Sequence, residues 1–146
     1  MRNQIYQEKL RWPWWLTLLT VGLDFSIVVA VWAGLGNTSA LIAAIISIAF
    51  TGYFYSISTL RISVEKDSFS VGRATIEKKY LGDIKVLTNN EFRSLSGPGI
   101  NPRAFHAFRF WIRRGLKVEI KDSRDPTPYW LVSSKSPEKL FEALQS

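Results

Sequence analysis

The chain from Trp12 to Leu60 is almost continuously apolar and contains a single Lys, Arg, Asp or Glu residue, Asp24. A water-soluble segment needs charges on a solvated face, whereas a charge near the bilayer centre costs roughly 3 kcal/mol. Turn-forming residues interrupt the run at Gly34 to Thr38. Since about 20 helical residues cross the hydrocarbon core, the pattern predicts a membrane α-helical hairpin, with two transmembrane helices over about 13–34 and 39–58.

Charges on either side of the apolar run predict its orientation. Basic residues flank both ends, whereas the connecting turn has none, which favours a two-pass protein of the plasma membrane with both termini in the cytoplasm. The bilayer is thus the first expected partner. A cleaved signal peptide is the alternative for the first helix, but its apolar run is long and a second one follows almost at once.

After residue 59 the pattern changes to the two-residue period of β-strands. Leu60, Ile62 and Val64 alternate with polar residues, and a turn at Lys66 to Ser68 leads to Phe69 and Val71, which predicts a hairpin. Further strands are expected at 74–78, 84–87, 106–113, 116–120 and 129–133. The step Arg113 to Gly115 suggests a second hairpin. A short helix is expected at 90–95.

The chain ends with a predicted helix that starts after Ser136, an N-cap candidate, with Pro137 at the first helical position. Several strands followed by one helix is the order of a pleckstrin-homology-like fold, a bent antiparallel sheet closed at one end by the helix. We therefore expect two domains: 1–59, an N-terminal segment with the hairpin, and 60–146, a small α+β, mostly antiparallel β domain on the cytoplasmic side.

Composition argues against several classes of activity. The net charge of +7 invites a nucleic-acid interpretation, but acidic residues are mixed among the basic ones and much of the charge flanks the membrane, so no nucleic-acid partner is expected. The single histidine, His106, and the absence of cysteine argue against a zinc site, and no nucleotide-binding glycine pattern occurs. We expect no cofactor, no metal, no catalytic residue and no enzyme. The alternative is a subunit of a membrane enzyme or transport complex that uses Asp24, or His106 with Arg103, directly.

Asp24 is the most informative residue of the apolar region. An intramembrane carboxylate indicates an ion path or a polar contact, and two helices provide little wall for a pore. Counting back from the turn places Asp24 near Ser47 and Thr51, within a stripe of small side chains suited to close packing. We therefore expect Asp24, Ser47 and Thr51 to form an intramembrane contact, within one hairpin or through self-association.

Basic and aromatic residues of the C-terminal part form a second candidate site. Lysines and arginines beside an anionic leaflet each contribute on the order of 1 kcal/mol of attraction. The expected surface for anionic inner-leaflet phospholipid or a protein partner consists of Lys78, Lys79, Arg103, Arg109, Trp111, Arg113, Arg114 and Lys117. The interpretation is a membrane-anchored interaction or scaffold module that binds a protein partner and anionic lipid.

Several segments carry a resemblance to a known family. They include Tyr6-x-Glu8-x-Leu10, Pro13-Trp14-Trp15, Val71 to Ala74, Tyr80 to Gly82 and Asn101 to Phe105, and the most distinctive is Asp125 to Ser133. Nearly end to end, the chain resembles the actinobacterial membrane proteins catalogued as domain of unknown function thirty ninety-three. The resemblance implies a two-pass membrane protein and supplies no activity.

Overall fold

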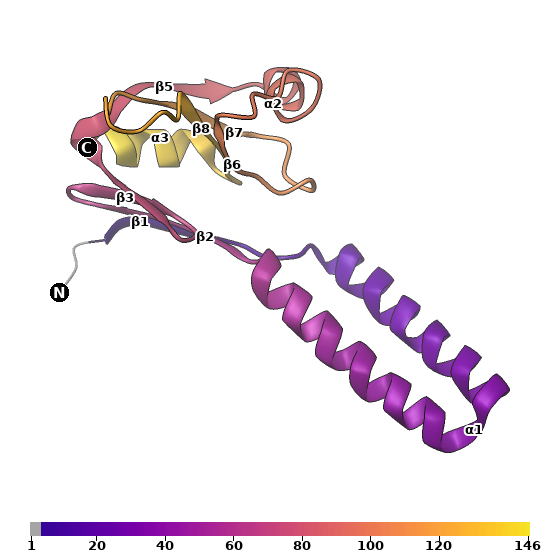
Figure 1. Cartoon of the computed structure of the whole chain (residues 1–146). Helices are drawn as coiled ribbons and strands as arrows, with labels where there is room; N and C mark the ends of the chain where they lie inside the picture. Colours follow the sequence, from indigo (N-terminus) through magenta and orange to yellow (C-terminus); the bar gives the residue numbers. More distant parts are fainter. Residues whose placement is uncertain (1–3) are drawn as a thin grey trace. The chain divides into compact units, whose positions relative to one another are not determined.

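The computed structural model describes residues 4–146 of the chain (Figure 1). They form two compact units, each described by itself below. One is the helical unit Arg11–Thr59, and the other is a β unit made of residues 4–10 together with Leu60–Ser146. The expected division into 1–59 and 60–146 is therefore wrong for the N-terminal segment, which belongs with the β unit because it pairs with a strand there.

The helical unit consists of one helical element, α1 (Trp14–Ser58). The prediction of two transmembrane helices separated by a turn at Gly34 to Thr38 is wrong, because the helix continues through four of these five positions. Only Gly36 departs from helical geometry, with φ 81° and ψ −175°. Glycine adopts a positive φ without a Cβ clash, so one residue is enough to redirect the helix.

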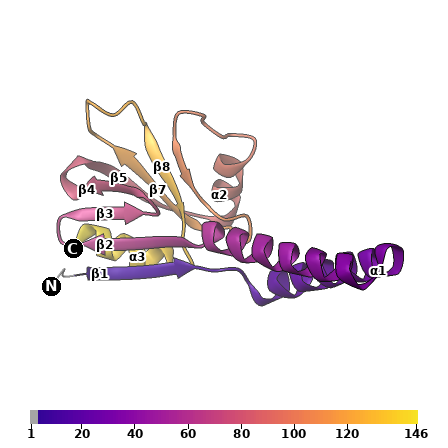
Figure 2. The ribbon, with the colours of Figure 1, turned by 60° about the horizontal axis from the view of Figure 1, so that its bottom comes forward.

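The kink at Gly36 divides α1 into two arms that run side by side (Figures 1 and 2). Beside the kink, the indole Nε1 of Trp32 donates a hydrogen bond to Oδ1 of Asn37 at 2.7 Å. At the opposite end of the arms, the rings of Trp12 and Tyr55 meet edge to face with centroids 5.5 Å apart. Side-chain contacts therefore hold the arms together at both ends.

The first sheet of the β unit has the order β1-β2-β3-β4 and is antiparallel throughout. It consists of β1 (Gln4–Leu10), β2 (Leu60–Glu65), β3 (Ser68–Val71) and β4 (Ala74–Glu77). The predicted hairpin of β2 and β3 is confirmed, and its alternating residues Ile62, Val64 and Phe69 are fully buried. Because Leu10 pairs with Leu60, the chain leaves and re-enters this sheet at neighbouring positions.

The second sheet has the order β5-β7-β8-β6. It consists of β5 (Leu81–Leu87), β6 (Phe105–Ala107), β7 (Gly115–Ile120) and β8 (Tyr129–Ser133), and the helix α2 (Asn89–Ser96) connects β5 to β6. The predicted strand 106–113 is confirmed only at its start. The predicted hairpin across Arg113 to Gly115 is wrong, since β7 pairs with β5 and β8, while β6 pairs in parallel with β8.

The C-terminal helix α3 (Pro137–Gln145) contacts strands of both sheets, β1 and β2 on one side and β5 and β7 on the other. Its buried residues Leu140, Ala143 and Leu144 join a core with side chains from both sheets. The helix is confirmed, although the side chain of Ser136 makes no capping hydrogen bond. The prediction of a pleckstrin-homology-like fold with a single bent antiparallel sheet is wrong. The described residues form two four-stranded sheets, of which one includes β1 from before α1 and the other includes the parallel pair β6 and β8.

Glu8 attaches β1 to the segment between β8 and α3. Its Oε2 accepts hydrogen bonds from the hydroxyls of Tyr6 at 3.0 Å and Ser134 at 2.6 Å, and its Oε1 accepts from the amide of Lys135 at 2.7 Å. Burial, followed by the charge of Glu8, raises the pKa of Tyr6 to about 12. Glu8 therefore fastens the strand that enters α1 to the β unit.

Candidate functional site

A hydrogen bond between apolar stretches joins the two arms of α1. The hydroxyl of Thr51 donates to Oδ2 of Asp24 at 2.8 Å, and both residues are half-buried. Ser47 is also half-buried but makes no hydrogen bond to Asp24 among residues 4–146. The hydroxyl of Thr20 bonds to the carbonyl of Leu16, so it is not the partner of the carboxylate.

Burial along the arms shows which faces meet. In the first arm the half-buried positions Leu16, Thr20, Asp24 and Val28 recur every four residues, which places them on one face. The second arm contributes a stripe of small residues, in which Ala40 is 8% exposed. The other half-buried members of this stripe are Ser39, Ala43, Ala44, Ser47 and Thr51. Small side chains let the two backbones approach closely, and Asp24 lies in this seam.

Two lysines of the predicted basic surface have structural partners instead. Lys78 donates from Nζ to the carbonyls of Ala143 at 3.0 Å and Ser146 at 3.3 Å, and thereby caps the end of α3. A cation there opposes the negative end of the helix dipole. Lys79 forms an ion pair with Glu77 at 2.6 Å, which raises the pKa of this exposed lysine.

The remaining predicted residues are spread over the β unit. Lys117 lies on β7, 3.6 Å from a carboxylate oxygen of Glu119 and above the ring of Tyr129. Trp111 is half-buried against the core. Arg103 and Arg114 are exposed. The structure therefore does not gather the eight predicted residues into one surface.

A pocket of about 300 Å³ brings together two of the predicted residues, Arg109 and Arg113, with a third arginine, Arg93, from the last turn of α2. We call it the arginine pocket. Its other lining residues are Phe92, Ser96, Gly97, Pro98, Phe108, Phe110 and Ile112. None of the lining residues that the structure describes carries a carboxylate. Sequence reasoning missed Arg93 because the residue lies on a separate helix, and only tertiary packing brings that helix beside the segment 108–113.

Arg109 is half-buried and makes two hydrogen bonds within the β unit. Its amide donates to the hydroxyl of Ser133 at 3.0 Å, and its guanidinium Nη1 donates to the carbonyl of Phe108 at 3.1 Å. Burial lowers the pKa of Arg109 from its ordinary value. The ring of Phe108 meets that of Phe92 edge to face, with centroids 6.3 Å apart, and forms part of the apolar lining.

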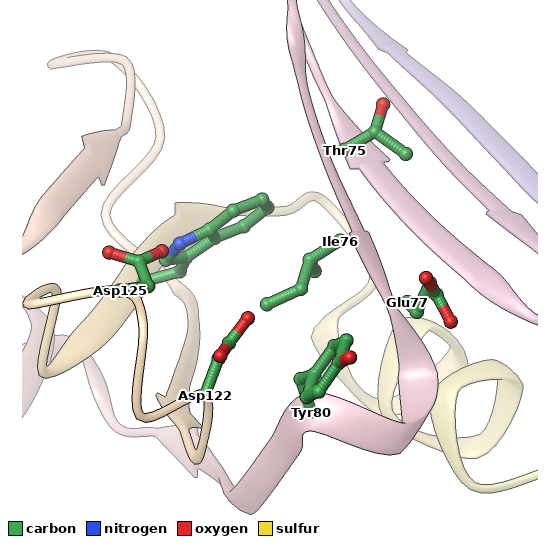
Figure 3. A pocket seen from close by; sticks show the side chains of 7 residues that line it. Thr75, Ile76, Glu77, Tyr80, Asp122 and Asp125 are labelled. Carbon is green, nitrogen blue, oxygen red and sulfur yellow. The ribbon is translucent and has the colours of Figure 1, made fainter.

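A second pocket, of about 390 Å³, has an acidic lining that includes Glu77, Asp122 and Asp125 (Figure 3). The carboxylates already have partners. Arg124 contacts Asp122 at 3.0 Å and also donates to the hydroxyl of Tyr80, and its hydrogen bonds to Asp122 lower the pKa of that carboxyl. Asp125 accepts a hydrogen bond from the amide of Thr127. Among residues 4–146 no group of His, Cys, Asp and Glu has the arrangement of a metal site.

His106 lies on β6, where Nε2 is 2.8 Å from the carbonyl oxygen of Asn101. Its Nδ1 is buried and has no hydrogen-bond partner in the described part of the chain. Its ring lies edge-on to Phe108, with centroids 5.9 Å apart. The surroundings of the histidine are thus a backbone carbonyl and an aromatic ring.

Comparison with known proteins places the chain in a family. No curated protein and no solved structure gives a significant match. A family model described as "Protein of unknown function (DUF3093)" matches residues 5–144, which includes both arms of α1 and nearly all of the β unit, β1 among its strands except for Gln4. The chain therefore belongs to this family of proteins of unknown function.

Proposed function

We propose that the protein is a membrane-anchored interaction module, in which α1 is embedded in the plasma membrane and holds the β unit at its cytoplasmic face. The exposed surface of α1 carries the proposal. Within residues 4–146 it is the one helix long and apolar enough to cross a membrane. Its exposed side chains include Trp14 at 75% and Ile48 at 70%. An apolar surface of this extent on a water-soluble protein would promote aggregation.

α1 is one kinked helix rather than two helices joined by a turn, but each of its arms has about the length that crosses the hydrocarbon core, roughly 20 residues. Leu10, which precedes α1, pairs with Leu60, which follows it. The chain therefore leaves the β unit before the first arm and returns to it after the second arm at neighbouring residues. Arg11 and Arg61 flank these ends, whereas the kink at Gly36 has no charged neighbour. The positive-inside rule then favours a cytoplasmic β unit and a kink on the outer side.

The β unit supports the role of a binding module for a protein partner and for lipid. It exposes Phe110, which is 65% accessible, beside the arginines of the arginine pocket. Exposed aromatic and arginine side chains are the residue types that anchor interfaces most often. In this proposal the Asp24 to Thr51 bond has an assembly role, since it joins the arms that carry the module.

Single cysteines test the proposed topology directly, because the chain has none of its own. A membrane-impermeant maleimide applied to intact cells should label Thr38→Cys, beside the kink, and should label Lys121→Cys, in the β unit, only after lysis. Ile48→Cys is the decisive control. Its position is highly exposed in the chain, so protection from the reagent requires lipid. Labelling of Ile48→Cys at the rate of Lys121→Cys after lysis would overturn membrane insertion.

The interaction role has its own measurement. In native membranes solubilised with a mild detergent, the full chain should migrate as a complex larger than the chain with its detergent alone. Thr51→Val, which removes the bond to Asp24, should shift this population toward the smaller species. A single small species for both proteins would contradict the assembly role.

A further inference from the structure

The arginine pocket brings the side chains of three arginines to one surface cavity. Elsewhere in the described residues, some cations form an ion pair with a carboxylate, as Lys85 does with Glu91 at 2.6 Å. In contrast, Arg93 and Arg113 form no ion pair with any of residues 4–146, and both are exposed. Guanidinium groups without a carboxylate partner match the geometry of a phosphate, which accepts two parallel N–H hydrogen bonds.

The pocket is also apolar over part of its lining. Phe92 is buried and packs edge-on against Phe108, while Phe110 remains 65% exposed with its ring against Trp111 at 4.8 Å. An inorganic anion has no apolar surface that could pack against an exposed aromatic ring. A ligand with both an anionic group and a hydrocarbon part would contact the arginines and Phe110 together.

From this combination we propose that the arginine pocket binds an anionic phospholipid, with the phosphate at Arg93 and Arg113 and the start of an acyl chain against Phe110. The choice of a membrane phospholipid as the ligand rests on the proposed function, because a chain embedded through α1 has phospholipid at high local concentration. Arg109, which also lines the pocket, adds positive charge and makes hydrogen bonds to Phe108 and Ser133.

The test uses the full chain purified in uncharged detergent micelles and a water-soluble probe, dihexanoyl phosphatidylglycerol, with dihexanoyl phosphatidylcholine as the neutral comparison. Titration calorimetry should show tighter binding of the phosphatidylglycerol. Arg93→Gln and Arg113→Gln should each weaken this binding about five- to tenfold, which is the loss expected for one arginine contact to an anionic lipid. Both side chains are exposed, so the variants should keep the thermal stability of the parent protein.

Arg114→Gln is the matched control. This exposed neighbour of Arg113 does not line the pocket, and it holds its place through its backbone carbonyl, which accepts from the amide of Ser134 at 3.1 Å. The same loss of charge one residue away should leave the affinity unchanged. An equal loss for Arg114→Gln and Arg113→Gln would overturn a specific pocket in favour of general surface attraction.

Phe110→Ser separates a lipid from a free phosphate. The variant should weaken binding of dihexanoyl phosphatidylglycerol and leave any binding of inorganic phosphate as it is. If inorganic phosphate binds as tightly as the lipid, or if the phosphatidylcholine binds as tightly as the phosphatidylglycerol, the proposal is wrong. Because micelles have no sidedness, this result is independent of the cysteine-labelling test, and a failure of either proposal can be recognised separately.

Discussion

Removal of the Glu8 carboxylate should release β1 from the β unit. The side chain accepts three hydrogen bonds, two of them from residues beyond β8, and the hydroxyl of Ser134 is fully buried. A hydrogen bond to a charged group contributes roughly 1.5–3 kcal/mol, and a buried donor left without its acceptor adds to the cost. Allowing for solvent access to Lys135, we expect Glu8→Ala to lower the free energy of opening of β1 by about 3 kcal/mol.

Glu8→Gln should cost less, about 1–2 kcal/mol, because its amide oxygen can still accept from the amide of Lys135 while the hydroxyls of Tyr6 and Ser134 rotate to accept from its NH₂ group. The control is Gln7→Ala, on the opposite, exposed face of β1, which should change stability by less than about 0.5 kcal/mol.

Amide hydrogen exchange of the full chain in micelles measures this opening. Peptides that cover β1 and its partner β2 should exchange roughly 100-fold faster in Glu8→Ala, since each 1.4 kcal/mol is a factor of ten. Peptides from the arms of α1 serve as an internal reference. Wild-type protection of β1 in Glu8→Ala, or an equal loss in Gln7→Ala, would refute the argument that this carboxylate fastens the strand.

Three further predictions concern other parts of the chain. Gly115→Ala should destabilise the β unit by about 3 kcal/mol or prevent folding, because the new Cβ would lie 1.9 Å from the carbonyl oxygen of Val132. Thermal unfolding measures this loss, and Gly34→Ala, whose Cβ meets nothing within 4 Å, is the control. Thr51→Val should weaken the contact of the arms by about 1 kcal/mol, seen as a lower yield of a disulfide between Val28→Cys and Ser47→Cys, two half-buried positions that each lie four residues from the bonded pair toward the kink. An unchanged yield would count against the Asp24 bond. The wild type should lose stability between about pH 10 and 12, because the folded state keeps the proton of Tyr6, whose pKa is raised to about 12, after the unfolded state has released it. Urea titrations should show a weaker loss of stability in Tyr6→Phe, and parallel curves for the two proteins would exclude Tyr6 as the cause.

The form of the reversal between the two arms was not predictable from local composition. Gly34 to Thr38 has the composition of a turn, which predicts a non-helical connection there. In the structure the neighbours of Gly36 keep helical geometry, because a single positive φ at a residue without Cβ redirects the chain. Local composition thus predicted the place of the reversal but not how few residues it needs.

β1 was missed although its signal is present in the sequence. Tyr6, Glu8 and Leu10 alternate with exposed residues in the two-residue period of a strand, and Leu10 is fully buried. The segment is short and lies beside a long apolar run. Its partner β2 begins only after both arms of α1 have been traversed, so no local pattern indicates the pairing.

The sequence by itself determined the properties that depend on local pattern: the apolar run with Asp24 as its one charged residue, the alternating strands β2 and β7, the apolar strand β8, and the C-terminal helix. Residue order along one element is enough to specify each of these. The tertiary structure alone decided which distant residues meet. It joined β1 to β2, placed Arg93 beside Arg113, and used Lys78 to cap α3 rather than to face a ligand. Such contacts arise from the packing of whole elements, whose energy depends on shape and burial rather than on sequence separation.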